Sequence, residues 1–332
     1  MILSLDGGAT KTVALVFDEI NLNLCGIGLS GPTNLTSVTK EEVISNIRRA
    51  VSKACQEADI KISSLHKGIF GVAGIGDSPS LTKFGEEIIS ESTGRNDFHV
   101  LNDGIPAYEM ANLDLDGIVF AGGTGSVAFL KNGNRIERRG GWNWFAGDNG
   151  SASWIARSGL NLATFEYDGI YSEKYLIEGV ESYFKEDFRE ALTTIERSQN
   201  KRHVAGFAPI VTKLAETGYP PASKILDESA DYVADLIKST LYKFKKVPRV
   251  SLVGGTMLAG RTYTDRIKSR LNMDINVYYG YQVAAGGLLL ILKELGLDYS
   301  FETRDKILEQ MNIKLMKKSK DELYKFLSLT RF

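Results

Sequence analysis

Short apolar runs alternate with longer stretches of helical spacing along the whole chain. The first apolar run covers residues 2–6, a glycine-rich turn follows, and further runs cover 12–17 and 24–29. Apolar runs of this length, bounded by Gly, Asp and Asn, are typical of β-strands. The pattern therefore predicts a sheet that begins with a β-hairpin.

Helical spacing follows these strands. The apolar positions on one face of a helix expected over residues 40–58 are Val43, Ile47, Ala50, Val51 and Ala54. We expect Thr39 to be its N-cap, because a threonine before acidic residues is typical of a helix start. A strand over 66–72, a helix over 79–92 and a strand over 97–101 come next. This alternation of strands and helices predicts an α/β protein.

A second cycle repeats the first in kind. An apolar run over 117–121 leads into the turn Gly122-Gly123-Thr124-Gly125-Ser126, and another apolar run follows to residue 130. A third glycine pair, Gly254-Gly255, follows a run over 249–253. Two similar hairpins about 115 residues apart predict a duplicated fold in which both hairpins hold one anion.

The rest of the chain is mostly of helical pattern. Amphipathic stretches are expected over residues 151–163, 204–217 and 222–243, and the last thirty residues also have helical spacing. We expect one domain over residues 1–114 and a second over 115–302 with a helical insertion. A C-terminal helix over about 303–332 is expected to complete the first domain.

Composition and charge exclude several classes of protein. The 332 residues are 43% apolar and 24% charged, as in ordinary globular proteins of two domains. The net charge of -1 argues against a nucleic-acid or membrane-surface partner. Cys25 and Cys55 are not in a Cys-x-x-Cys pair, so one chain does not build a zinc or iron–sulfur site. With a strand expected from Ile2 and no apolar run long enough for a bilayer, we expect no leader and a cytoplasmic location. We also expect a homodimer.

The first turn carries candidate phosphate-binding chemistry. Glycines allow backbone N–H groups to approach an anion, and Thr10, Lys11 and Thr12 add donors. Asp6, at the end of the first strand, offers an oxygen ligand to Mg²⁺. The turn is neither a P-loop nor a dinucleotide fingerprint, because a strand rather than a helix follows it. A plain Gly-Gly hairpin is the alternative, and the repeat of the motif favours nucleotide binding.

Five phrases in order make the chain resemble the N-acetylglucosamine kinase and BadF-type ATPase family, within the actin-like and hexokinase-like ATPases. They are Asp6-Gly7-Gly8-Ala9-Thr10-Lys11-Thr12, Gly31-Pro32-Thr33-Asn34, Asn102-Asp103-Gly104, Gly122-Gly123-Thr124-Gly125-Ser126, and Gly140-Gly141-Trp142 with Gly147-Asp148-Asn149-Gly150-Ser151. The resemblance is strong over the first 160 residues. It implies two ribonuclease H-like (actin-like ATPase) domains that flank a central cleft, and an ATP-dependent sugar kinase.

The resemblance also implies roles for individual residues. ATP phosphates would be bound by Gly8, Thr10, Lys11, Thr12, Thr124, Gly125 and Ser126, adenosine by Gly254 and Gly255, and Mg²⁺ by Asp6. A sugar would be bound by Asn34, Asp103, Gly141, Trp142 and Asp148. Asp103 also suits the base that phosphoryl transfer needs, and Trp142 or Trp144 offers a surface for the apolar face of a sugar. Without the resemblance, the phrases around Asp103 and Asp148 would be read as a plain turn and a helix start capped by Ser151.

Two departures from the family pattern bear on the acceptor. Asn149 stands where relatives usually have Glu, and Arg138-Arg139 precede Gly140 where comparable sugar kinases have smaller or neutral residues. An arginine near the acceptor suits a carboxylate, so a sugar acid such as 2-keto-3-deoxygluconate is the alternative acceptor, with Arg139 as its ligand. A solvated hairpin turn explains the two arginines equally well.

Two other functions of related proteins are less compatible with the sequence. The activator ATPases of 2-hydroxyacyl-CoA dehydratases bind an iron–sulfur cluster through cysteines after the second hairpin, and no cysteine follows Cys55 here. A sugar-responsive regulator needs a DNA-binding segment, for which a hairpin that begins at residue 2 leaves no room. The sequence therefore predicts an ATP- and Mg²⁺-dependent kinase that acts on a small sugar.

Overall fold

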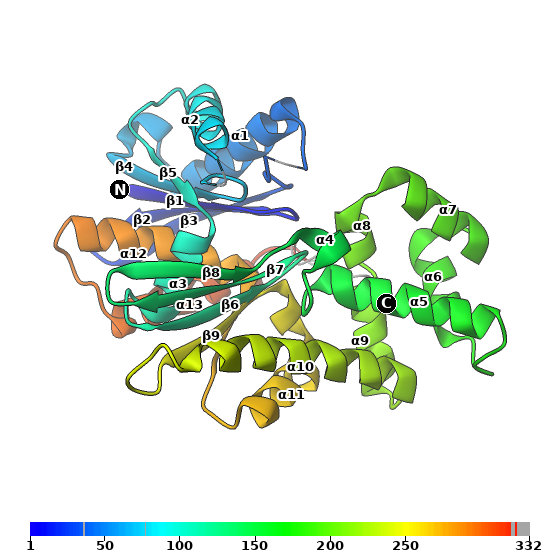
Figure 1. The fold of residues 1–332 in the computed structure, drawn as a ribbon. Helices are drawn as coiled ribbons and strands as arrows, with labels where there is room; N and C mark the ends of the chain where they lie inside the picture. The colour runs from blue at the N-terminus through cyan, green and yellow to red at the C-terminus, as the bar shows by residue number, and fades with distance from the viewer. Residues whose placement is uncertain (36, 77, 320–322, 324–332) are drawn as a thin grey trace. The chain divides into compact units, whose positions relative to one another are not determined.

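The computed structural model describes residues 1–35, 37–76, 78–319 and 323, and Figure 1 traces the chain. The described residues form two compact units, and each contains a five-stranded sheet. Unit 1 comprises Met1–Leu115 and the described residues from Tyr279 onward, and unit 2 comprises Asp116–Tyr278. Residues 320–322 and 324–332 of the expected C-terminal helix lie outside the described residues.

The sheet of unit 1 begins with the expected hairpin. Its strands are β1 (Ile2–Gly7), β2 (Thr12–Asp18), β3 (Asn23–Ser30), β4 (Lys67–Val72) and β5 (His99–Asn102), in the order β3-β2-β1-β4-β5. The first three strands are antiparallel neighbours, whereas β4 is parallel to β1 and β5 is parallel to β4. The ends of β1, β4 and β5 therefore meet at one edge of the sheet.

Helices cover the sheet of unit 1 on both faces. They are α1 (Lys40–Glu57), α2 (Pro79–Thr93), α3 (Gly104–Asn112), α12 (Ala284–Glu294) and α13 (Phe301–Met316), with short 3₁₀ turns η1 (Ile62–Ser64) and η3 (Gly280–Val283). The Thr39 hydroxyl accepts a hydrogen bond from Glu42 N at 3.3 Å, so the expected N-cap of α1 is confirmed. On the side of α1 and α2, the buried core includes Leu3, Val16, Ile47, Phe70 and Ile88.

Helix α12 packs on β1 although nearly the whole chain separates them. Ser4 Oγ donates to Ala284 O at 2.6 Å, and Gly287 lies so close to Ser4 that a Cβ would meet its Oγ at 2.2 Å. This contact groups α12 with unit 1, whereas the sequence-based division placed residues up to 302 in the second domain.

The sheet of unit 2 repeats that of unit 1. Its strands are β6 (Gly117–Gly122), β7 (Ser126–Asn132), β8 (Arg135–Gly140), β9 (Arg249–Gly254) and β10 (Asn276–Tyr279), in the order β10-β9-β6-β7-β8. As in unit 1, the first three strands are antiparallel and the fourth is parallel to the first. The duplicated α/β fold that the two glycine-rich hairpins predicted is therefore confirmed.

A helical insertion separates β8 from β9. Its helices are α4 (Asn143–Ala146), α5 (Ala152–Tyr167), α6 (Tyr175–Phe184), α7 (Phe188–Ser198), α8 (Lys201–Ala205), α9 (Ala208–Glu216) and α10 (Pro220–Leu241). After β9 follow η2 (Gly255–Ala259) and α11 (Arg261–Leu271). The amphipathic stretch expected over 204–217 contains the end of one helix and the whole of the next: α8 ends before Gly206, and Pro209 in the first turn of α9 marks a new start.

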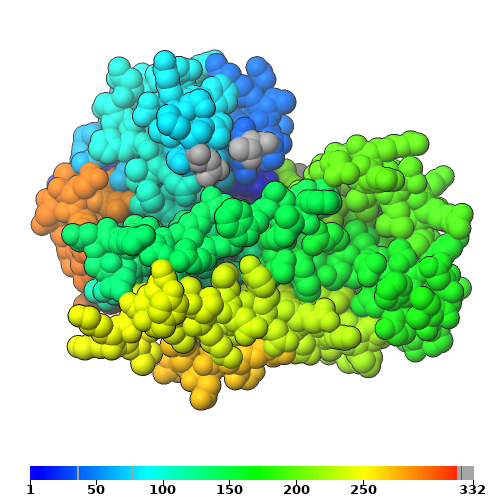
Figure 2. Space-filling model, in the orientation of Figure 1, coloured from blue at the N-terminus to red at the C-terminus, as the bar shows by residue number. Residues whose placement is uncertain are grey.

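The insertion and the sheet of unit 2 share one apolar core, which includes Phe120, Ile155, Phe207, Val233 and Tyr263. At the surface, Figure 2 shows the green hairpin of β7 and β8 beside the yellow end of α10, where Lys243 pairs with Glu137 at 2.7 Å. In the part of the chain that the structure describes, no helix is both long and apolar enough to cross a membrane.

Candidate active site

Backbone hydrogen bonds fix the turn between β1 and β2. Gly8 N donates to Lys11 O at 3.0 Å and closes the turn. Gly7 O accepts from Ala73 N at 2.9 Å, and Gly8 O accepts from Thr33 N at 3.0 Å. The turn is thus held by the loops that follow β3 and β4. It presents Thr10 and Lys11 from a rigid frame, as a phosphate-binding turn requires.

Two carboxylates meet near this turn. Asp6, in β1, is half-buried; burial and, after it, the negative charge of Asp103 raise its pKa to about 8, against the opposing effect of Lys11. Burial likewise lowers the pKa of Lys11 to about 8, against the attraction of Asp6. The three groups therefore form one electrostatic cluster in which two like charges lie close together.

This cluster suits a divalent cation. Mg²⁺ is usually held by one or two carboxylates together with waters and phosphate oxygens, rather than by a cage of protein ligands. Asp6 and Asp103 supply two carboxylates, and their mutual repulsion would be relieved by a cation. Among the described residues, no group of three or more His, Cys, Asp or Glu side chains forms a complete metal site.

The loop after β5 holds Asp103 in place. Asn102 Nδ2 donates to Ile75 O at 2.6 Å, and its Oδ1 accepts from Gly104 N at 2.9 Å. Asp103 then occupies the N-cap position of α3, with helical backbone angles. The phrase is therefore a strand-to-helix junction rather than a plain turn, and Asn102 is a positioning residue that the sequence reasoning missed.

The loop that carries Asn34 is tied to the first hairpin. Thr12 is fully buried; its hydroxyl donates to Gly31 O at 2.7 Å and lies 3.0 Å from Thr33 Oγ1. Asn46 Nδ2 donates to Pro32 O at 2.8 Å. Asn34 itself is half-buried in this loop. The hydroxyl of Thr12, expected among the phosphate donors, thus serves to join the hairpin to the Asn34 loop.

The second hairpin is braced in the same way. Gly123 N donates to Gly125 O at 2.8 Å across the turn, and Ala152 N donates to Gly123 O at 2.9 Å. Ser126 Oγ donates to Asn149 O at 2.7 Å. Thr12 and Ser126 both begin the second strand of their sheets, and each hydroxyl bonds a carbonyl of the loop after the third strand. The two units therefore share not only the strand order but also this side-chain hydrogen bond.

Gly254 packs against the second hairpin. Its φ is +128°, and a Cβ there would lie 2.0 Å from Gly122 O. Thr256 Oγ1 donates to the same carbonyl at 2.8 Å. Gly255 begins η2 with no atom within 4 Å of a Cβ built on it. Gly254 is thus required for close approach, whereas Gly255 leaves open space for a ligand.

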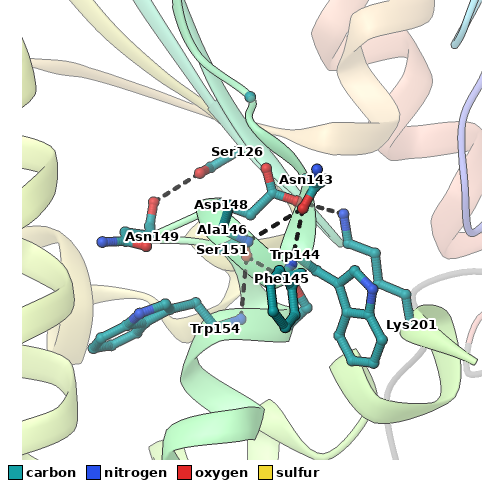
Figure 3. A network of polar contacts seen from close by, with 12 residues as sticks. Ser126, Asn143, Trp144, Phe145, Ala146, Asp148, Asn149, Ser151, Trp154 and Lys201 are labelled. Atoms are coloured by element: carbon teal, nitrogen blue, oxygen red, sulfur yellow. Dashed lines mark hydrogen bonds and ion pairs between the residues drawn. The ribbon is translucent and has the colours of Figure 1, made fainter. Parts of the chain in front are cut away.

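Asp148 forms the centre of the polar network in Figure 3. Its side chain is 4% exposed, and its backbone adopts φ +54°, which is uncommon for a residue other than glycine. Lys201 Nζ, from the first turn of α8, lies 2.5 Å from Asp148 Oδ2. Both atoms would be 2.9 Å from a Cβ on Gly125, so the tip of the second hairpin contacts this pair.

The segment before Asp148 is also ordered by polar contacts. Within the short helix α4, Asn143 Oδ1 accepts hydrogen bonds from Phe145 N and Ala146 N (Figure 3). Gly140 and Gly141 both have positive φ, and Arg157 donates to the carbonyl of Trp144. Trp142 is 71% exposed, so its indole is available to a ligand. Ser151, whose hydroxyl accepts from Trp154 N, caps α5 as the alternative interpretation expected.

Neither arginine lies in a hairpin turn, because both belong to β8. Arg139 Nη2 donates to Glu137 Oε2 at 2.8 Å, and Arg138 Nη2 donates to Gly141 O at 2.7 Å. The Arg139 charge is therefore compensated by Glu137, which also pairs with Lys243.

Sequence reasoning missed two further side chains near Asp148. Lys201 stands 53 residues after Asp148, outside the amphipathic stretches that the sequence predicts. The other is Tyr232, on α10; burial raises its pKa, and the charge of Asp148 raises it further. No local motif marks either residue, since both reach Asp148 only through the folding of the insertion.

The match to known protein families covers most of the chain. Residues 3–290 match the model of the BadF/BadG/BcrA/BcrD ATPase family. The chain belongs to this family. The predicted resemblance is therefore confirmed, and the repeated sheet is the α/β fold of the actin-like and hexokinase-like ATPases.

Curated relatives of the chain include proteins named as sugar kinases. An N-acetylmuramic acid/N-acetylglucosamine kinase of Clostridium acetobutylicum is 25% identical over 233 residues, which are 69% of this chain and 75% of the relative. An N-acetyl-D-glucosamine kinase of Dictyostelium discoideum is 25% identical over 256 residues, 73% and 79% of the two chains. A solved structure of a proposed N-acetylglucosamine kinase from Chromobacterium violaceum matches with TM-score 0.72 at 20% identity, covering 87% of this chain and 98% of its own. This last likeness concerns the fold.

Proposed function

We propose that the protein is an ATP-dependent carbohydrate kinase that transfers the γ-phosphoryl group to a hydroxyl of an N-acetylglucosamine-type sugar. The observation that carries this proposal is an electrostatic cluster. In it, Asp103, at the start of α3, interacts with Asp6 and Lys11 of the glycine-rich hairpin. Membership of an ATPase family and the named activities of two relatives support it.

The nucleotide is held by the two hairpins. Backbone N–H groups around Gly8 and Gly125, with the side chains of Thr10, Lys11 and Thr124, bind the phosphates. Thr12 and Ser126 fix the two turns through their buried hydroxyls. Gly254 and Gly255 line the adenosine site, where Gly255 leaves room for the base or ribose. Asp6 would hold Mg²⁺, which would supply charge neutralisation for the phosphate oxygens.

The acceptor is bound by Asn34, Asp103, Gly141, Trp142 and Asp148. Vicinal hydroxyls pair with the carboxylates and the amide, and the exposed Trp142 packs on an apolar face of the ring. Asp103 accepts the hydroxyl proton while the sugar oxygen forms a bond to the γ-phosphorus. The bond from that phosphorus to the bridging oxygen breaks, and ADP leaves.

An ADP-release assay over a panel of acceptors tests this function. The panel contains glucose, glucosamine, N-acetylglucosamine, N-acetylmuramic acid and 2-keto-3-deoxygluconate, each with ATP and Mg²⁺. We expect stimulation by an N-acetylated hexosamine well above the rate of ATP hydrolysis without sugar. No stimulation by any member of the panel would refute the kinase function.

The sugar-acid alternative depends on Arg139. Its guanidinium is compensated by Glu137 at 2.8 Å, which favours a neutral acceptor. An Arg139→Ala variant should therefore change kcat/KM for a neutral hexosamine less than about threefold. A loss of about tenfold or more that appears only with the acid acceptor would instead assign Arg139 to a carboxylate. Lys238→Ala, at an exposed lysine of α10 in the same unit, is the control.

We further propose that the protein is cytoplasmic, since ATP is the phosphoryl donor and is available in the cytoplasm. We also propose that it is a homodimer. Sedimentation equilibrium of the purified chain tests the oligomeric state. A single species at 36.6 kDa would refute the dimer.

A further inference from the structure

The tip of the second hairpin contacts a buried carboxylate. Asp148 is 4% exposed, and its Oδ2 lies where it would be 2.9 Å from a Cβ on Gly125. Gly125 belongs to the turn that we assign to the phosphates of the nucleotide. A carboxylate beside this turn would repel a triphosphate bound there, because little water would separate the charges.

Lys201 compensates this charge in the structure. Its Nζ lies 2.5 Å from Asp148 Oδ2 and would also be 2.9 Å from a Cβ on Gly125. The lysine side chain is 30% exposed, so its ammonium needs less desolvation than the carboxylate. Asp148 and Lys201 together present a neutral pair to the hairpin.

The helical insertion holds Lys201 in position. The side chain of Asn200 accepts from His203 N at 3.0 Å and caps α8, so Lys201 stands in the first turn. Val204 and Ala205 anchor the other end of α8 in the core of unit 2. The lysine is therefore placed by packing and not only by attraction to Asp148.

We propose that Lys201 is a positioning residue that neutralises Asp148, so that a magnesium nucleotide can bind at the Gly123–Ser126 turn. This inference rests on the proposed function, and it assigns to the insertion a role in nucleotide affinity. The carboxylate of Asp148 thereby stays available to the acceptor without repelling the phosphates. The charge balance of the pair, rather than a contact between Lys201 and phosphate, sets the affinity.

A double-mutant cycle on MgADP binding tests this proposal by calorimetry without sugar. Lys201→Met leaves Asp148 uncompensated and should weaken MgADP binding about tenfold or more. Asp148→Asn removes the repelling charge and should bind MgADP at least as tightly as the wild type. The double variant Lys201→Met/Asp148→Asn is neutral again and should bind within about threefold of the wild type.

A matched control and the contrary outcomes complete the design. Lys213→Met removes an exposed lysine of the same insertion, paired with Glu216 at 3.4 Å, and should leave binding unchanged. Unchanged affinity in Lys201→Met would overturn the inference, and so would a double variant as weak as Lys201→Met, because that result requires direct phosphate contact or structural damage. A wild-type chain that binds no MgADP would overturn the proposed nucleotide site itself.

Discussion

Asp103 is the residue on which the chemistry depends. It stands at the N-cap position of α3, and its charge raises the pKa of Asp6, after the larger effect of burial. An Asp103→Asn variant keeps the shape of the side chain but does not accept a proton. We expect turnover to fall by about 10²–10⁴-fold, as for the loss of other general bases, while MgADP binding persists.

Matched readouts separate this loss from misfolding. Asp168→Asn, at an exposed aspartate after α5, should keep full turnover. Retention of more than about a tenth of the wild-type rate by Asp103→Asn would remove Asp103 from the role of base. Loss of MgADP binding in the same variant would show that Asp103 acts mainly through the nucleotide site.

At the scale of elements, α1 and β3 pack through their backbones. A Cβ on Gly28 would lie 1.8 Å from Ala50 O, and one on Gly26 would lie 2.0 Å from Ala54 O. Gly26 and Gly28 are two residues apart in β3, so both face α1. The backbone of the helix therefore packs directly against the strand. No rotamer change relieves such a contact, since the opposing atoms are backbone.

A Gly28→Ala variant should therefore be strongly destabilised. We expect a loss of about 3 kcal/mol in the free energy of unfolding of unit 1, the upper range of overpacking, because α1 must shift from β3. Urea unfolding followed by far-UV circular dichroism measures the change. Ser52→Ala, on the exposed face of α1, should change it by less than about 0.5 kcal/mol. A destabilisation of Gly28→Ala no larger than that of Ser52→Ala would contradict the packing.

Local pattern was enough to predict most of the strands and the repeat, although it missed β8 and β10. The hairpins over β1–β2 and β6–β7 carry both an apolar alternation and a glycine-rich turn, so each could be recognised from neighbouring residues. The same holds for the Thr39 cap. The break between α8 and α9 was missed because Gly206 and Pro209 interrupt an apolar pattern that continues across both helices.

Contacts between distant residues could not be predicted in this way. Lys201 reaches Asp148 through the fold of the insertion, and α12 reaches Ser4 across 280 residues. Periodicity shows that a helix has an apolar face, but it does not show which sheet that face covers. The positions of the glycine-rich turns were therefore predicted from the sequence. The lysine that neutralises Asp148 and the helix that packs on β1 could be identified only from the structure.

At the scale of the whole chain, the last described helix returns to the first sheet. Gln310, on α13, accepts from Leu24 N at 2.5 Å and donates to Leu22 O at 3.1 Å. Lys314 donates to Cys25 O at 2.9 Å. Unit 1 thus contains segments from both halves of the sequence, and α13 covers the otherwise open edge strand β3.

Glu57 makes this closure depend on pH. Burial alone would raise its pKa, but hydrogen bonds from Lys314 at 2.8 Å and Lys318 at 2.7 Å outweigh burial, so the pKa lies below the ordinary value of 4.5. A carboxyl with a lowered folded pKa contributes stability that is present above the unfolded pKa and is lost as the pH falls through the folded value. The attachment of α13 should therefore be strongest near neutral pH and weaken below about pH 4.5.

Hydrogen exchange of residues 301–316 measures this attachment. In Glu57→Gln, we expect exchange about fivefold faster than in the wild type at pH 7, for a pair of contacts worth about 1 kcal/mol. The ratio of variant to wild type should shrink as the pH is lowered to 4, because the wild-type carboxyl then begins to take up its proton. Glu86→Gln, on the exposed face of α2, should leave the exchange of α13 unchanged at either pH. A ratio for Glu57→Gln that stays constant with pH would mean that the charge of Glu57 does not hold α13 against β3.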